Sequence, residues 1–172
     1  MWPTPRSVWP LPKPATSRAQ PWRSQVDSEA KAVLFDREAI LERIPHRPPF
    51  LFVDRILCLD DKYIESEWDV RPDAPFFEGH YPHNPIVPGV LLSEFAFQTA
   101  AVFIGEVARG AEGVPVLSKI ENARYRAMVR PDSCVLASLT LDDNLASAYY
   151  MTARLSESGR SVLRISFVVT LA

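Results

Sequence analysis

The sequence predicts an α+β domain in which an antiparallel sheet wraps around one central helix. Two observations lead to this fold class. The apolar stretch 88–107 has the length and composition of a single buried helix. Two segments before it and four after it have the residue types and turn boundaries of strands.

Short polar turns separate these strand segments, which is typical of antiparallel hairpins. The expected turns are 60–62, 142–144 and 156–159. The expected strands are 50–59, 63–70, 114–126, 134–141, 148–155 and 161–171. Ahead of them, Asp36 is placed to cap a short helix over 37–43, which the prolines from Pro45 onward end. Residues 71–89 are expected to form a long loop rich in Pro, Gly and His.

Composition narrows the possible functions. The chain has 172 residues, of which 47% are hydrophobic and 23% charged, enough for one domain with a packed core. It has 19 Lys and Arg and 21 Asp and Glu, a formal net charge of −2, which argues against nucleic-acid binding through an excess of positive charge. The longest uncharged apolar run, 95–105, is shorter than the roughly 20 residues that span a membrane. Cys58 and Cys134 fit no metal or redox spacing, so we expect two buried thiols in a reducing, cytoplasmic compartment.

Residues 1–25 differ from the rest of the chain. They contain six prolines, three of the four tryptophans, four basic residues and no acidic residue. This proline density breaks helical and strand periods, and we expect an extended or disordered tail. A transit peptide is an alternative, although prolines break the helix of such signals. Another is that the natural start lies near Val26. Residues 26–172 are expected to form a single domain.

The expected helix carries two polar residues in its apolar stretch. Glu94 and Gln98 lie one turn apart on the same side. Burying an unpaired carboxylate costs on the order of several kcal/mol, so Glu94 must be paired or protonated. Two interpretations remain: a structural pair with Gln98 or a salt bridge, or a carboxyl group tuned for proton transfer.

The loop before the helix, 75–90, combines three features that removal of a proton next to a carbonyl requires. Pro88 is placed at the helix start, so the N–H of Gly89 points outward and can stabilise an oxyanion. His80, in a stretch stiffened by proline, can act as a base near neutral pH. Glu94 can act as the matching acid. A structural role is the alternative for His80.

The other two histidines are interpreted differently. His46 lies between Pro45 and Pro48, and we read it as structural. His83 is expected at the loop surface, with a place at the mouth of the same site as the alternative.

Two long segments, 44–55 and 76–98, resemble the FabZ-type (3R)-3-hydroxyacyl-acyl-carrier-protein dehydratases, and 120–126 is a weaker third match. The resemblance spans about residues 36–172. It implies the hot-dog fold, a curved antiparallel sheet around one long helix. It also implies a homodimer with shared active sites, which can assemble into a trimer of dimers. The partner is an acyl carrier protein whose phosphopantetheine carries the substrate, with no metal or redox cofactor.

The resemblance assigns roles to individual residues. His80 takes the C2 proton, Glu94 delivers a proton to the departing C3 hydroxyl, and the Gly89 N–H binds the thioester carbonyl. The His of one subunit meets the Glu of the other. A related dehydratase that also isomerises the double bond uses Asp, so Glu94 favours dehydration alone. The expected substrate-binding residues are Gly79, Tyr81, Val87, Pro88, Phe95, Phe97 and Gln98.

The sequence departs from the family pattern at several positions. Phe95 and Phe97 stand where small residues usually flank the catalytic Glu. If either ring faces the acyl tunnel, the substrate is shorter or flatter, as in polyene or polyketide assembly rather than ordinary fatty-acid elongation. The alternative is packing in the core. His83 replaces the usual Gly, and Ala127 replaces a common basic residue.

Four basic residues near Ala127 are expected to meet an acidic carrier protein, with a solvated basic stripe as the alternative. They are Lys119, Arg124, Arg126 and Arg130.

Two other functions remain open. A hot-dog thioesterase would use the same oxyanion donor to hydrolyse the thioester, and a non-catalytic subunit would bind acyl chains without turning them over.

Overall fold

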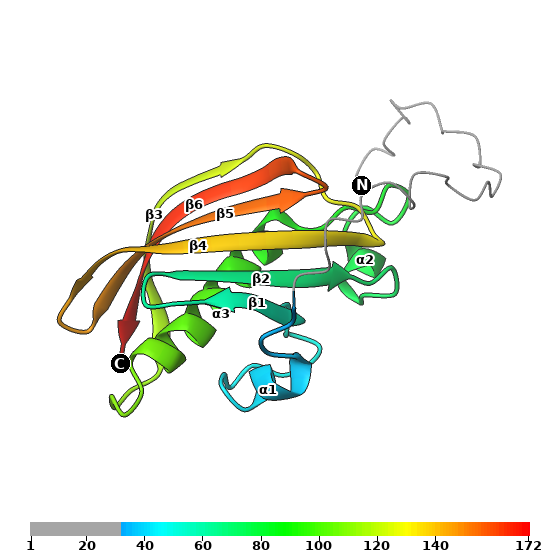
Figure 1. Cartoon of the computed structure of the whole chain (residues 1–172). Helices are drawn as coiled ribbons and strands as arrows, with labels where there is room; N and C mark the ends of the chain where they lie inside the picture. Colours follow the sequence, from blue (N-terminus) through cyan, green and yellow to red (C-terminus); the bar gives the residue numbers. More distant parts are fainter. Residues whose placement is uncertain (1–31) are drawn as a thin grey trace, which may run out of the picture. The chain divides into compact units, whose positions relative to one another are not determined.

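The computed structural model describes residues 32–172, and the predicted tail over 1–25 lies outside them. The described chain contains three helices and six strands (Figure 1). The helices are α1 (Arg37–Leu41), α2 (Phe76–Gly79) and α3 (Gly89–Val107). The strands are β1 (Arg55–Leu59), β2 (Tyr63–Val70), β3 (Pro115–Tyr125), β4 (Ser133–Leu145), β5 (Ala148–Glu157) and β6 (Arg160–Leu171).

All six strands join one antiparallel sheet in the order β1-β2-β4-β5-β6-β3. The long helix α3 runs along one face of this sheet and packs against β2, β3, β4, β5 and β6 (Figure 1). This arrangement confirms the predicted α+β class and is the hot-dog fold that the resemblance implies. Strands β1 and β3 form the two edges of the sheet.

The capped first helix is confirmed, because the Ala39 N–H donates to Asp36 Oδ1 over 3.0 Å. The first strand is shorter than predicted and begins at Arg55 rather than at residue 50. The reason is a tertiary contact. Gln98 of α3 binds the backbone N–H of Phe52 and the backbone carbonyl of Phe50, so this stretch pairs with the helix instead of with β2.

Two predicted loops also differ. Residues 71–89 contain the short helix α2. The polar run 142–144 continues β4 instead of forming a turn, and the chain reverses just after Leu145, where Ala146 has φ 55°. The Thr152 hydroxyl donates to Asp142 Oδ2 over 2.6 Å, so polar side chains in this part of β4 pair across the sheet surface.

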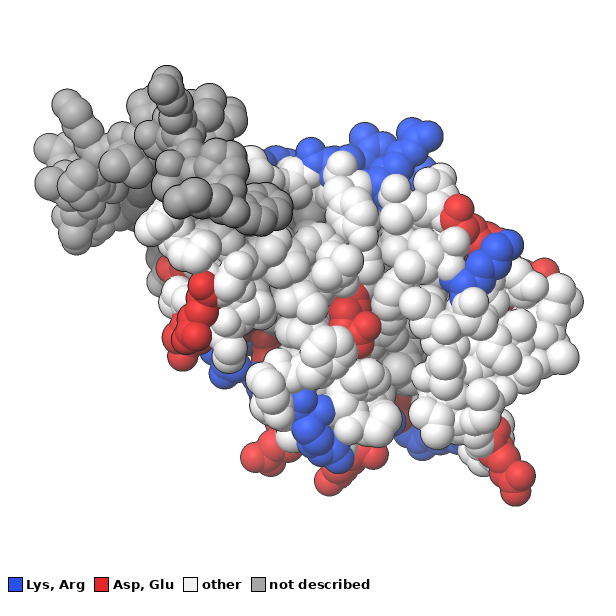
Figure 2. All heavy atoms as spheres, turned by 180° about the vertical axis from the view of Figure 1, so that it is seen from behind, with Lys and Arg blue, Asp and Glu red and all other residues white. Residues whose placement is uncertain are grey.

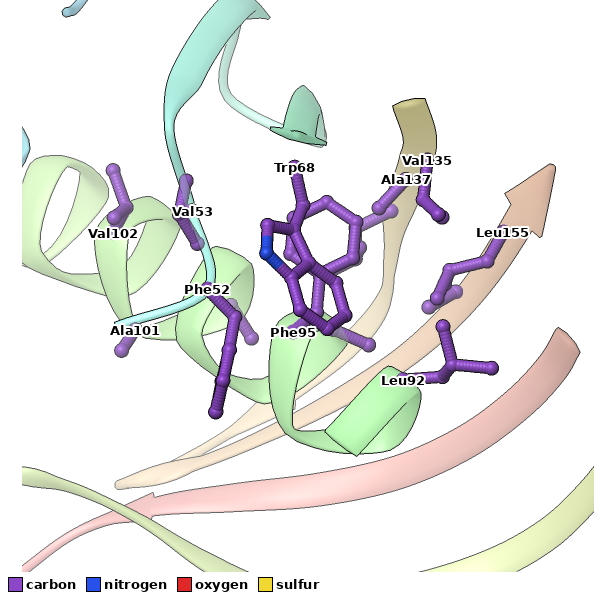
Figure 3. Close-up of a cluster of buried hydrophobic side chains, with 14 of the residues drawn as sticks. Phe52, Val53, Trp68, Leu92, Phe95, Ala101, Val102, Val135, Ala137 and Leu155 are labelled. Carbon is purple, nitrogen blue, oxygen red and sulfur yellow. The ribbon is translucent and has the colours of Figure 1, made fainter. Parts of the chain in front are cut away.

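The core lies between α3 and the sheet, where Trp68 of β2 packs against Phe95 of α3 with ring centroids 5.8 Å apart (Figure 3). Among residues 32–172, α3 alone has the length and hydropathy of a membrane span, yet 61% of its most apolar window is buried inside the fold. That is the usual state of a core helix. The predicted burial of this helix fails at its two ends, where Val90 is 71% and Val107 39% exposed.

The cysteine prediction is wrong in one respect. Cys58 and Cys134 are both free, but both are exposed rather than buried. They lie at sheet positions whose side chains face away from α3: Cys58 is paired with Glu65 of β2, and Cys134 with Asp69.

Candidate active site

The start of α3 is built as an anion-binding end. Pro88 is the N-terminal cap residue, and its carbonyl accepts from the Leu91 N–H over 2.9 Å. The first N–H groups of a helix have no intrahelical acceptor. Here the N–H groups of Gly89 and Val90 have no hydrogen-bond acceptor at all within residues 32–172. The expected oxyanion donor at Gly89 is therefore free to bind a ligand oxygen.

Tyr125, at the end of β3, covers this helix start. A Cβ atom built on Gly89 would lie 3.1 Å from the Tyr125 ring, close enough that the ring would have to shift. The Tyr125 hydroxyl and Ser93 Oγ share a hydrogen bond of 2.7 Å. Sequence reasoning did not find Tyr125 or Ser93 as site residues. Both residues lie in segments that match the family, Ser93 in 76–98 and Tyr125 in the weaker 120–126, but nothing in the sequence shows that they meet.

Glu94 and Gln98 form the predicted pair. Gln98 Nε2 donates to Glu94 Oε1 over 3.0 Å, and Gln98 itself is fully buried. The Phe52 N–H donates to Gln98 Oε1 over 2.9 Å, which fixes the amide so that its NH₂ group faces Glu94. The Glu94 side chain keeps about a fifth of its surface in solvent. Its second oxygen, Oε2, has no hydrogen-bond partner within residues 32–172.

His46 lies beside the same carboxylate. Its Nε2 atom is 3.6 Å from Glu94 Oε1. Its Nδ1 atom is buried and has no hydrogen-bond partner in the described part of the chain. The prediction of a structural role did not anticipate that His46 would approach the candidate acid.

A small hollow lies next to Glu94, and we call it the Glu94 hollow. Its lining residues come from α3, β3, β6 and the chain before β1: they are His46, Glu94, Phe97, Ala101, Pro115, Leu117 and Val169. Most of this lining is apolar, whereas its two polar members are a carboxyl group and an imidazole. A hollow of this kind suits an apolar chain with one reacting polar centre.

His80 follows α2, in the loop before α3. Its Nδ1 atom lies 2.9 Å from the Ile86 carbonyl, so Nδ1 carries a proton, and in the neutral imidazole the lone pair is on Nε2. The Tyr81 ring packs edge-on against the imidazole at 4.6 Å. Val87 N–H donates to the Val129 carbonyl and holds the loop in place. No hydrogen bond or ion pair between His80 and Glu94 occurs within the described chain.

The two phenylalanines beside Glu94 have different surroundings. Phe95 is fully buried in the core against Trp68. Phe97 is half-buried, packs against Phe167 with ring centroids 4.8 Å apart, and lines the Glu94 hollow. Of the two, only Phe97 lines this hollow.

The four basic candidates do not share one environment. Lys119 pairs with Glu121, and Arg130 donates to Asn84. Arg124 and Arg126 line a polar hollow near the end of β3, together with Asn122, Arg164 and Ser166. Arg164 lies directly across from Arg124 in the strand pairing, and no local pattern marks it as a site residue. Figure 2 shows Lys and Arg side chains gathered along the upper edge of the molecule.

Among residues 32–172, no group of three His, Cys, Asp or Glu side chains could hold a metal ion. The fold and the site together define a hot-dog domain with a histidine, a carboxyl group and a free helix-start N–H. Residues 44–166 match the FabA-like domain, and the chain belongs to this family.

Curated relatives agree with the resemblance seen in the sequence. The chain is 32% identical over 141 residues to the 3-hydroxyacyl-[acyl-carrier-protein] dehydratase FabZ of Rickettsia felis, covering 81% of this chain and 97% of that protein. It is 31% identical over the same length and coverage to the FabZ dehydratase of Rickettsia rickettsii (strain Sheila Smith). The predicted family is thus confirmed.

Solved structures show the same fold at low identity. The dehydratase heterocomplex ApeI:P from Xenorhabdus doucetiae matches with a TM-score of 0.67 and 15% identity, over 77% of this chain and 90% of that one. A hypothetical thioesterase with coenzyme A from Streptococcus pneumoniae TIGR4 matches with a TM-score of 0.56 and 11% identity, over 77% and 90%. Both likenesses concern the fold alone.

Proposed function

We propose that this protein removes water from (3R)-3-hydroxyacyl thioesters carried on an acyl carrier protein, giving trans-2-enoyl thioesters. The FabZ relatives, which the chain matches over nearly their whole length, support this reaction and its place in fatty-acid biosynthesis. The observation that carries the proposal is Glu94, which Gln98 holds beside a mostly apolar hollow and whose Oε2 has no hydrogen-bond partner within residues 32–172. No metal or redox cofactor is needed for this elimination.

The proposed mechanism uses three groups. His80 Nε2 takes the C2 proton, and the electron pair moves toward the thioester carbonyl. The Gly89 N–H, at the positive end of α3, stabilises the oxygen as it gains charge. Glu94 gives its proton to the C3 hydroxyl as the C3–O bond breaks, so the hydroxyl leaves as water. The histidine ends protonated and the carboxyl group ionised, and solvent resets both.

We further propose a homodimer in which His80 of one subunit completes the site around Glu94 of the other. Two features support it. Within one chain no bond joins the two residues. The edge strand β3 also leaves large apolar side chains exposed, among them Val116, Ile120 and Tyr125, as expected of a strand that pairs with another chain. A trimer of such dimers is the larger assembly proposed.

Carrier-protein docking is proposed at the hollow formed by Arg124, Arg126 and Arg164. These guanidinium groups have no ion pair within residues 32–172, so they are available to an acidic partner. We place the enzyme in the cytoplasm, where carrier-bound acyl chains are elongated.

Replacing the two candidate catalytic groups tests this proposal. We expect Glu94→Gln and His80→Ala each to lower turnover by roughly 10²–10⁴-fold, the usual range for losing a general acid or base. The matched control is His83→Ala, an exposed histidine of the same loop, which should retain normal turnover. A folded Glu94→Gln protein with near-normal turnover would refute the role of the carboxyl group.

A further inference from the structure

We infer that His46 is a positioning residue for the acid: together with Gln98, it keeps Glu94 Oε1 as a hydrogen-bond acceptor, so that the acidic proton resides on Oε2. This inference rests on the proposed role of Glu94. It assigns a function to the imidazole that the sequence marked only as structural.

The first part of the argument is the orientation of Gln98. An amide can present either its oxygen or its nitrogen to a neighbour. Here the Phe52 N–H donates to Gln98 Oε1, and Nε2 donates to the Phe50 carbonyl over 3.2 Å as well as to Glu94 Oε1. The opposite orientation would set the NH₂ group against the Phe52 N–H. Gln98 is therefore a donor to Glu94 Oε1.

The second part is the tautomer of His46. Nδ1 is buried without a partner among residues 32–172, and Nε2 faces Glu94 Oε1. Because Nδ1 is unpaired in either tautomer, the choice depends on Nε2. A proton on Nδ1 would set the Nε2 lone pair against a carboxyl oxygen that already accepts from Gln98. A proton on Nε2 avoids this repulsion and makes His46 a second donor toward Oε1.

The separation of 3.6 Å is longer than a hydrogen bond, so in this substrate-free state the interaction is an electrostatic one. Catalytic hydrogen bonds are often long in free enzymes and shorten when substrate binds. Since both donors point at Oε1, the proton of the neutral acid is left on Oε2, which has no partner within residues 32–172. That is the oxygen free to approach a substrate hydroxyl.

His46 and the two backbone groups that orient Gln98 belong to one segment, 46–52. This segment lies outside the sheet because its backbone is used to hold the α3 side chain. The predicted strand over 50–59 begins only at Arg55 for the same reason. Segment 46–52 thus lies against Glu94 because it supplies His46 and the groups that orient Gln98.

The test compares a variant that keeps the donor with one that keeps the shape. His46→Gln retains an N–H donor near the Nε2 position, whereas His46→Phe retains a planar ring without a donor. We expect His46→Phe to lower kcat about 10- to 100-fold with KM within about twofold, because the acid is misplaced rather than the substrate lost. His46→Gln should keep kcat within about fivefold of the unaltered protein.

A second comparison separates this inference from the proposed function. In a Glu94→Gln background, His46→Phe should cause no further loss, because His46 acts through Glu94. Normal kcat in folded His46→Phe, or equal losses in the Phe and Gln variants, would overturn the inference while leaving Glu94 as the acid. If Glu94→Gln itself had normal kcat, the proposed function would fail, and this inference with it. Should His46→Phe not fold, a low kcat in a folded His46→Gln variant would equally overturn the donor role.

Discussion

Single side chains in this protein differ in reactivity because of a few close neighbours. The Cys134 thiol lies beside Asp69 at the start of β4. Cys134 keeps part of its surface in solvent, but desolvation by the atoms around it raises the pKa of this thiol to about 12, and the negative charges of Glu67 and Asp69 act in the same direction. The thiolate is the reactive form, so its fraction at neutral pH is far lower than for a thiol at the ordinary value.

We therefore predict that iodoacetamide at pH 8 modifies Cys58 well before Cys134, although both are exposed. Peptide mass spectrometry at several reaction times measures the two rates in one sample, and the unfolded protein is the control, since there both thiols should react alike. Equal rates in the folded protein would contradict the surroundings described for Cys134.

The two aromatic residues beside Glu94 should respond differently to truncation. Phe97→Ala is expected to shift the chain-length preference toward longer acyl chains, because this ring lines the Glu94 hollow. Phe95→Ala is expected to lower the free energy of unfolding by about 3–5 kcal/mol, because it empties a fully buried site against Trp68. Turnover of a series of 3-hydroxyacyl thioesters, with denaturant unfolding of each variant, checks both. An unchanged profile in Phe97→Ala would assign that ring to the core instead.

At the scale of elements, the approach of β3 to the start of α3 depends on one glycine. Gly89→Ala would place a methyl group 3.1 Å from the Tyr125 ring, which must then move. We expect kcat/KM to fall roughly tenfold through displacement of the groups around the helix start. Gly105→Ala in the same helix is the control, since its Cβ would meet only an ordinary contact with the Arg43 carbonyl at 3.6 Å. Equal activity of the two variants would show that the Gly89–Tyr125 contact is not needed.

The sequence predicted those elements whose local pattern agrees with the fold. The helix over 88–107 and the strand 63–70 were found almost to the residue, because an apolar stretch and a polar turn mark them. The strand predicted over 50–59 is too long at its start. No local pattern shows that the backbone of its first half is hydrogen-bonded to Gln98 instead of to a strand. The polar run 142–144 has the composition of a turn. That it continues β4 depends partly on Asp142 accepting from the Thr152 hydroxyl of β5, a contact that the sequence alone does not show.

The candidate site, too, could be predicted only where its residues lie close together in the sequence. His80, Gly89 and Glu94 lie within 15 residues of one another, so motif and spacing could connect them. Tyr125 and His46 meet the site only through tertiary structure, and for Arg164 the pairing of β6 with β3 is required. Contacts between distant segments are what a single sequence does not contain.

At the scale of the whole molecule, the exposed edge strand β3 is expected to join two chains. We predict that Ile120→Lys, at a site 49% exposed in one chain, gives a monomer with little activity because the shared sites no longer form. Leu145→Lys is the matched control, since it is 58% exposed but lies at the far end of β4. Light scattering gives the mass of each variant. A dimeric, active Ile120→Lys protein would contradict the proposed interface.

The central claim is that this chain exchanges water across the C2–C3 bond of a thioester that stays intact. The most direct measurement is incubation of the full chain with trans-2-enoyl thioesters of several lengths, following the enoyl absorbance and identifying the products by mass. We predict loss of absorbance and gain of one water with the thioester bond retained, and almost no change with Glu94→Gln. Release of free acid and thiol would instead identify a thioesterase, and no change at any length, on carrier protein or free, would contradict the account.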